Sequence, residues 1–129
     1  MAPAETPTGF LRIARRDLST ATAMAMADPT VFAEDVWGFY LQQATEKALK
    51  AWLLVLSPEQ PPLSHNLRLL FQMLRDQDAA IDRYIGLSRF TLFAVLRRFD
   101  EELEPVNLDR PLWNHLCADL LDHVASLIP

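Results

Sequence analysis

Three polar residues near the carboxyl end of the chain, His115, Asp119 and Asp122, are spaced four and three residues apart. On a helix this spacing places all three side chains on one face. One imidazole nitrogen and two carboxylates would suit a divalent metal. The alternative is a solvated helix face, and such groups of polar residues are common there. We favour the solvated face and expect neither a resident metal nor a cofactor.

A second polar group lies in the stretch YLQQATEKALKAWL, residues 40–53, where Gln43, Lys47 and Lys50 follow one line of a helix. Glu46 precedes Lys50 by four residues. On an exposed helix such a pair contributes only a few tenths of a kcal/mol. From spacing alone, this line indicates a face in contact with solvent.

Asp17 falls inside the apolar face of the helix predicted for residues 8–27. A carboxylate in this position is costly unless it is paired or hydrogen-bonded. Lys47 or Lys50 of the following helix could supply the cation. We therefore predict that Asp17 is at least half buried and forms a structural ion pair, with Lys47 as its first partner, rather than a catalytic group.

The elements that must position these residues are all predicted to be helices. Residues 32–56 are rich in good helix formers, and Asp109 is placed to cap a last helix that begins at Arg110. Further helices are predicted for residues 66–75 and 88–99, with a short turn at 79–85. The helix at 32–56 should lie centrally, because half of its apolar stripe is alanine and permits close approach: Trp37, Leu41, Ala44, Ala48, Ala51 and Val55.

Length and composition indicate one all-α domain over residues 1–129, an up-and-down bundle of four to five helices with residues 1–8 as a loose tail. The net charge of −5 gives no overall basic footprint for nucleic acid. Lys47 and Lys50 are the only lysines among twelve basic residues, so ten are arginines and local phosphate sites remain open. The single cysteine, Cys117, indicates the cytoplasm, and no apolar run is long enough to suggest a membrane span.

The segment QQATEKALKAWL, residues 42–53, resembles the signature of the HEPN family, small helical domains whose second helix typically reads QQAxEKxLKA. RRDLSTA, residues 15–21, resembles the DLxxA segment of the family's first helix. SHNLRLL, residues 64–70, resembles its THxL segment. The three segments occur in the family's order, and the resemblance extends from about residue 10 to residue 128, so it implies a HEPN-like bundle.

The resemblance implies a partner of a minimal nucleotidyltransferase in a two-protein, toxin–antitoxin-like module. It also implies a groove for a nucleotide or RNA, and we assign six polar residues to it: Gln43, Lys47, Lys50, His65, Arg97 and Arg98. For His65 the alternative is a local structural role at the start of the third helix. Residues 97–100, RRFD, resemble the Arg-Tyr-Pro that often ends the penultimate helix in the non-toxin branch of the family.

The resemblance also implies a homodimer. Apolar residues lie nearly all round the helix predicted up to residue 99, so we expect it to be largely buried. We therefore expect a two-fold interface formed by this helix or by the last one.

Catalytically active HEPN proteins carry an Arg followed, after four to six residues, by a His, and they cleave RNA without a metal. The His serves as acid or base, and the Arg stabilises phosphate charge. Arg110 and His115 have this spacing, so the alternative function is a metal-independent ribonuclease toxin. Pro111 replaces the usual polar residue after the Arg, and we expect weak or absent activity in the isolated protein. A third function is a non-enzymatic helical scaffold.

Overall fold

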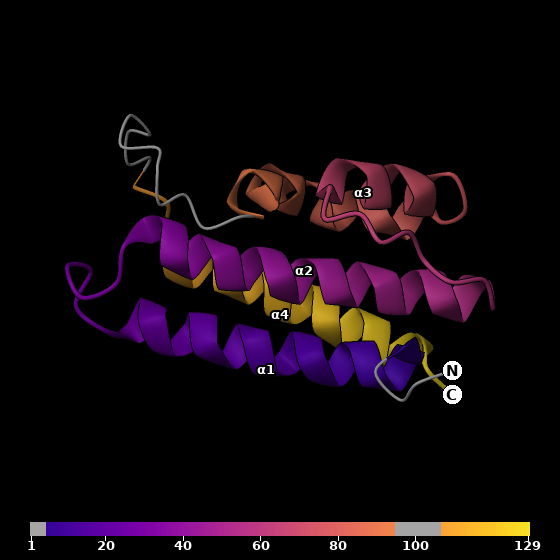
Figure 1. The fold of residues 1–129 in the computed structure, drawn as a ribbon, viewed down its shortest axis with the longest axis horizontal. Coiled ribbons are helices and arrows are strands. Elements are labelled where there is room, and N and C mark those ends of the chain that lie inside the picture. The colour runs from indigo at the N-terminus through magenta and orange to yellow at the C-terminus, as the bar shows by residue number, and fades with distance from the viewer. Residues whose placement is uncertain (1–4, 95–106) are drawn as a thin grey trace.

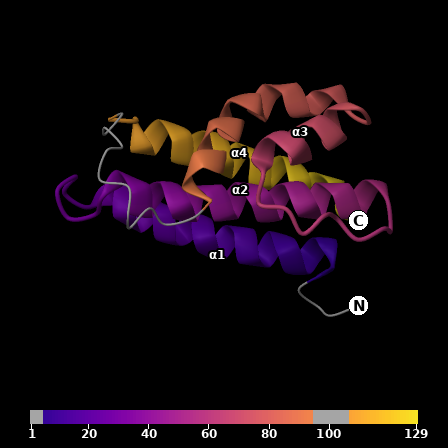
Figure 2. The same cartoon turned by 45° about the horizontal axis from the view of Figure 1, so that its top comes forward.

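The computed structural model describes residues 5–94 and 107–129. These residues form four α-helices, α1 (Pro7–Met26), α2 (Glu34–Leu56), α3 (Leu67–Arg75) and α4 (Arg110–Leu127), and a 3-10 helical segment, η2 (Ala79–Phe93). Neither described range contains a strand. The long helices α1, α2 and α4 run side by side, and the shorter α3–η2 pair covers α2 (Figures 1 and 2). The predicted all-α fold class is confirmed.

Helix α2 is the central element of the bundle, since it packs against α1, α3, η2 and α4. Trp37, Leu41, Ala44, Ala48 and Ala51 have no exposed surface, as their shared stripe predicted. The alanines leave room for neighbouring helices to approach closely. None of the helices in the described ranges has the length and apolar composition that crossing a bilayer requires.

Side-chain caps begin α1 and α4, whereas Ala33 at the start of α2 makes no side-chain cap hydrogen bond. The Thr6 hydroxyl accepts a hydrogen bond from the Gly9 backbone (2.9 Å) at the start of α1, and Asp109 accepts one from Leu112 (3.1 Å) at the start of α4. Two helix boundaries differ from the prediction. Thr6 caps α1 in place of Thr8, and α2 begins at Glu34 rather than residue 32.

The segment η2 departs from the predicted break at residues 86–88. Its buried side chains recur every third residue: Ile81, Tyr84, Leu87 and Phe90. A 3-10 helix has three residues per turn, so this period places all four on one side. Leu92 is 53 % exposed, so the expectation of a helix buried nearly all round is wrong for this residue. Residues 95–106, which include Arg97 and Arg98, lie outside the described residues.

Asn114 joins three helices through two buried hydrogen bonds. Its Oδ1 accepts from Trp37 Nε1 on α2 (2.9 Å), and its Nδ2 donates to the Ala21 carbonyl on α1 (3.1 Å). The sequence predicts a core stripe on this helix from the spacing of Trp113, Leu116, Leu120, Val124 and Leu127. Leu120 and Val124 are buried, but Trp113 and Leu116 are only partly buried, so the buried side of α4 is rotated toward Asn114.

We expect Asn114→Ala to lower the free energy of unfolding by about 2 kcal/mol, because it leaves the Trp37 N–H and the Ala21 carbonyl buried without partners. Urea denaturation would measure the change. Leu63→Ala is a suitable control, since Leu63 is 94 % exposed, and it should change stability by less than about 0.5 kcal/mol. Equal stability of the two variants would contradict the role assigned to Asn114.

Candidate functional site

The Glu46 carboxylate on α2 has no exposed surface and four polar partners. Its Oε1 accepts from Gln42 Nε2 (3.0 Å) and lies 2.8 Å from His65 Nδ1. Its Oε2 accepts from Lys47 Nζ and Lys50 Nζ, each at 3.1 Å. We call these five residues, Gln42, Glu46, Lys47, Lys50 and His65, the Glu46 cluster.

Burial alone would raise the pKa of Glu46, but its partners outweigh that effect. The charge of Lys47, the hydrogen bonds from Gln42 and His65, and the charge of Lys50 together lower the pKa to about 2. Glu46 is therefore ionised near neutral pH. An ionised carboxylate only accepts hydrogen bonds, so His65 must donate through Nδ1–H and keeps Nε2 for another contact. Two ammonium groups around one carboxylate leave one positive charge in the cluster.

Further hydrogen bonds connect the cluster to its surroundings. Gln43 lies beside it, donating to Gln42 Oε1 (2.6 Å) and accepting from Lys47 Nζ (3.1 Å). The His65 carbonyl accepts from Gln42 Nε2 (3.2 Å) and from Thr91 Oγ1 (3.4 Å). These bonds tie α2 to the residues before α3 and to η2, so His65 also has the local structural role considered as its alternative.

Four of the six residues predicted to bind a ligand come together here: Gln43, Lys47, Lys50 and His65. The prediction that the line of Gln43, Lys47 and Lys50 faces solvent was wrong for the two lysines. The side chain of Lys50 is 8 % exposed and that of Lys47 is 19 % exposed, whereas that of His65 is 62 % exposed. Helices α1, α3 and α4 and the segment η2 all pack against α2, and its polar line is therefore mostly covered rather than solvated. Arg97 and Arg98 are outside the described residues.

The direct Asp17–Lys47 ion pair predicted from the sequence is not formed. Asp17 is half-buried, and within the described part of the chain it has no basic partner within 4.0 Å. Burial raises the pKa of Asp17, and the nearby charge of Lys47 partly opposes this effect. Lys47 instead contacts Glu46, the preceding residue, because this contact requires no approach across helices.

Arg110 and His115 do not converge within one chain. The Arg110 guanidinium is 5.7 Å from the centroid of the Trp37 ring, and Arg110 lines a hollow of 610 Å³ near the end of α1. His115 is exposed in a separate hollow, with Nε2 3.8 Å from Asp119 Oδ2. Residues five apart on a helix point about 140° away from each other, which explains the separation.

The metal alternative is also not supported by the geometry. Asp122 Oδ1 lies 3.4 Å from Arg15 Nη2, and Asp119 Oδ2 lies 3.7 Å from Arg83 Nη2. Residues 5–94 and 107–129 contain no group of three or more His, Cys, Asp or Glu side chains arranged to hold a metal. These carboxylates form surface ion pairs instead.

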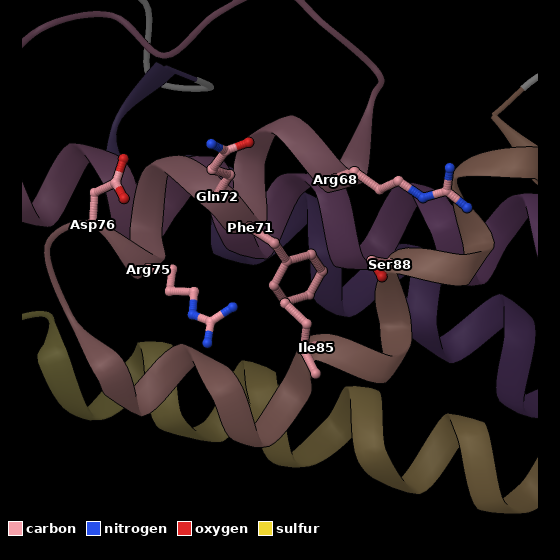
Figure 3. A pocket seen from close by; sticks show the side chains of 7 residues that line it. All are labelled: Arg68, Phe71, Gln72, Arg75, Asp76, Ile85 and Ser88. Atoms are coloured by element: carbon pink, nitrogen blue, oxygen red, sulfur yellow. The ribbon is translucent and has the colours of Figure 1, made fainter.

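Sequence reasoning missed a groove between α3 and η2, which has a volume of 390 Å³ (Figure 3). We call it the α3–η2 groove, lined by Arg68, Phe71, Gln72, Arg75, Asp76, Ile85 and Ser88. The available signal was the helical spacing of Arg68, Phe71 and Arg75 along α3. The opposite wall comes from η2, whose position a sequence pattern does not reveal.

Comparisons with known proteins bear on the family. A family model of the HEPN domain matches residues 8–105, more than two thirds of the 129 residues. Neither the curated proteins nor the solved structures contain a significant match. The matched region includes the Glu46 cluster and the α3–η2 groove, and it ends before Arg110 and His115. The family match and the all-helical fold together show that this chain belongs to the HEPN family.

Proposed function

We propose that this HEPN protein is the helical partner of a minimal nucleotidyltransferase in a two-protein, toxin–antitoxin-like module. We further propose that it binds a phosphate of a nucleotide or RNA at the Glu46 cluster. The observation that carries the proposal is the convergence of Gln43, Lys47, Lys50 and His65 around one buried carboxylate. This cluster lies inside the region that matches the family.

The Glu46 cluster has a buried part and an edge that solvent reaches. Glu46 and Lys50 are buried and hold their neighbours in place. Lys47 and His65 reach the surface, with 19 % and 62 % of their side chains exposed. An anion at this edge would accept hydrogen bonds from the Lys47 ammonium and, when the imidazole carries both protons, from His65 Nε2. The Lys47 ammonium favours phosphate over a neutral ligand.

The partner is tested by co-expression with the protein encoded in the neighbouring gene, with an affinity tag on only one protein. The two proteins should purify together and remain together through size exclusion at moderate salt. Separate elution after co-expression would count against the partner proposal. It would favour the scaffold function only if this protein were found in another assembly.

The phosphate site is tested by fluorescence anisotropy with labelled ATP and a labelled single-stranded RNA. Lys47→Gln should weaken binding by about tenfold, since one charge-assisted contact is lost. Arg12→Gln removes the same charge from an exposed position on α1 and should leave binding unchanged. Equal binding by both variants would show that the phosphate does not bind at the Glu46 cluster.

We expect the protein to self-associate through α4. Leu112 is 61 % exposed beside a hollow of 230 Å³ that Trp113 and Leu116 also line. A specific dimer should bury more than about 1,000 Å² in total. Sedimentation at tens of micromolar should show a dimer, and Leu112→Glu should shift it toward monomer. A monomeric wild type would contradict this expectation.

We expect no ribonuclease activity above background from the isolated protein, because Arg110 and His115 face different hollows. The measurement is cleavage of single-stranded RNA without metal by wild type and by His115→Ala. Robust cleavage that His115→Ala abolishes would place the ribonuclease function first. Such a result would require the two residues to meet across two chains.

A further inference from the structure

We propose that the α3–η2 groove binds a small organic oxyanion, a ligand that carries a phosphate or carboxylate group on a compact apolar body. The groove has a volume of 390 Å³, within the range of about 300–1,000 Å³ that small-molecule sites occupy. Helix α3 contributes Arg68 and Arg75, with Phe71 between them (Figure 3). Ile85 and Ser88 of η2 form the facing wall.

Hydrogen-bond donors dominate the lining. Arg68 makes no ion pair with any residue in the described ranges, and Arg75 uses Nε for Asp82 Oδ1 (3.2 Å), which leaves its terminal nitrogens. Gln72 and Ser88 add an amide and a hydroxyl. Asp76 is the one carboxylate among the residues that line the groove. A matching ligand must therefore be rich in acceptors and negatively charged, and the guanidinium fork suits phosphate and carboxylate.

The two arginines can reach one anion by a change of side-chain rotamer. In the structure Arg68 extends away from Arg75 (Figure 3). Seven residues along a helix correspond to about 10 Å, and arginine side chains are long and flexible enough to meet between their Cα atoms. Phe71 is buried below this point, and Ile85 is 41 % exposed, so Ile85 supplies most of the apolar contact. The charged group is held by the arginines, and the apolar body lies on Ile85.

The α3–η2 groove shares no lining residue with the Glu46 cluster. The two sites can therefore be tested and can fail separately. Co-purification with a nucleotidyltransferase tests the proposed function, and it makes no use of the groove.

The test is an NMR titration of ¹⁵N-labelled protein with phenyl phosphate and, separately, with benzoate, which distinguishes a phosphate from a carboxylate source. The amides of Gln72 and Ser88 should shift and saturate with the tighter of the two ligands. Inorganic phosphate lacks the apolar ring and phenol lacks the anionic group, so each should bind at least about tenfold more weakly. Inorganic phosphate binding as tightly as phenyl phosphate would overturn the organic ligand.

Removal of both arginines tests the anion contact. The double variant Arg68→Gln/Arg75→Gln should weaken binding by at least about tenfold. The double variant Arg12→Gln/Arg16→Gln makes the same change of net charge on α1, an element that does not pack against α3, and should bind as wild type does. Equal weakening in both variants would show that binding depends only on net charge, and it would overturn the site.

One variant should strengthen binding, which a folding defect would not do. Asp82→Asn releases Arg75 from its ion pair and should tighten phenyl phosphate binding by about threefold. Asp122→Asn breaks a comparable surface pair with Arg15 (3.4 Å) and should have no effect. Weaker binding by Asp82→Asn would contradict the proposed role of Arg75.

Discussion

Replacement of Glu46 by alanine is expected to lower the free energy of unfolding by about 3–5 kcal/mol, the largest effect predicted for a single substitution. The carboxylate has no exposed surface, and the Lys50 side chain that it holds is only 8 % exposed. Without Glu46, this buried ammonium loses its anionic partner, and Gln42 loses an acceptor. The cost comes mainly from the charge left behind rather than from the lost contact itself.

Urea denaturation of Glu46→Ala would measure this loss, with Glu59→Ala as the control because Glu59 is exposed in the loop before α3. The control should change stability by less than about 0.5 kcal/mol. The double variant Glu46→Leu/Lys50→Met removes both charges and should recover part of the loss. A loss below about 1 kcal/mol in Glu46→Ala would show that Lys50 finds solvent on its own.

The second large effect is a loss of stability in acid caused by protonation of Glu46. Its pKa is about 2 in the folded protein against an ordinary value of 4.5. Because the folded pKa is the lower one, the stabilisation is complete above pH 4.5 and is lost as the pH falls toward 2. The difference corresponds to roughly 3 kcal/mol.

Protonation of Asp17 in acid has the opposite effect on stability. Burial raises the pKa of Asp17, so its carboxylate destabilises the folded protein at neutral pH, and this penalty is relieved as the pH falls through the raised pKa and is gone below the ordinary value of 3.8. The stability of wild type, Glu46→Gln and Asp17→Asn should therefore be followed from pH 7 to pH 2. The gap between wild type and Glu46→Gln should close between about pH 4.5 and 2. A constant gap would mean that Glu46 does not titrate in this range.

Local patterns in the sequence predicted the all-helical fold and the family. Helix capping depends on residues within one turn of each other, so Asp109 identified the start of α4. The apolar stripe of α2 depends only on spacing along one helix, and it correctly placed α2 at the centre. The segment at residues 42–53 belongs to the same helix, so the family was recognisable before any packing was known.

The period of η2 was present in the sequence, but its structural meaning was not. Ile81, Tyr84, Leu87 and Phe90 are three residues apart, a spacing that also occurs in α-helices. That meaning depends on packing, for example on the contact between η2 and Gly38 of α2. A Cβ at this position would lie 2.6 Å from Phe93 Cδ1, so the Phe93 ring of η2 occupies space beside α2 that a larger residue at position 38 would fill. That contact joins segments far apart in the chain.

The chemistry of the Glu46 cluster was decided by the tertiary structure. Spacing showed that Glu46 and Lys50 are neighbours, but it could not show whether the pair faces water. The elements packed against α2 bury Glu46 and Lys50, and His65 reaches Glu46 from the segment before α3. Burial turns a surface pair of small effect into a buried network whose loss is costly, because a charge without water depends on its protein partners.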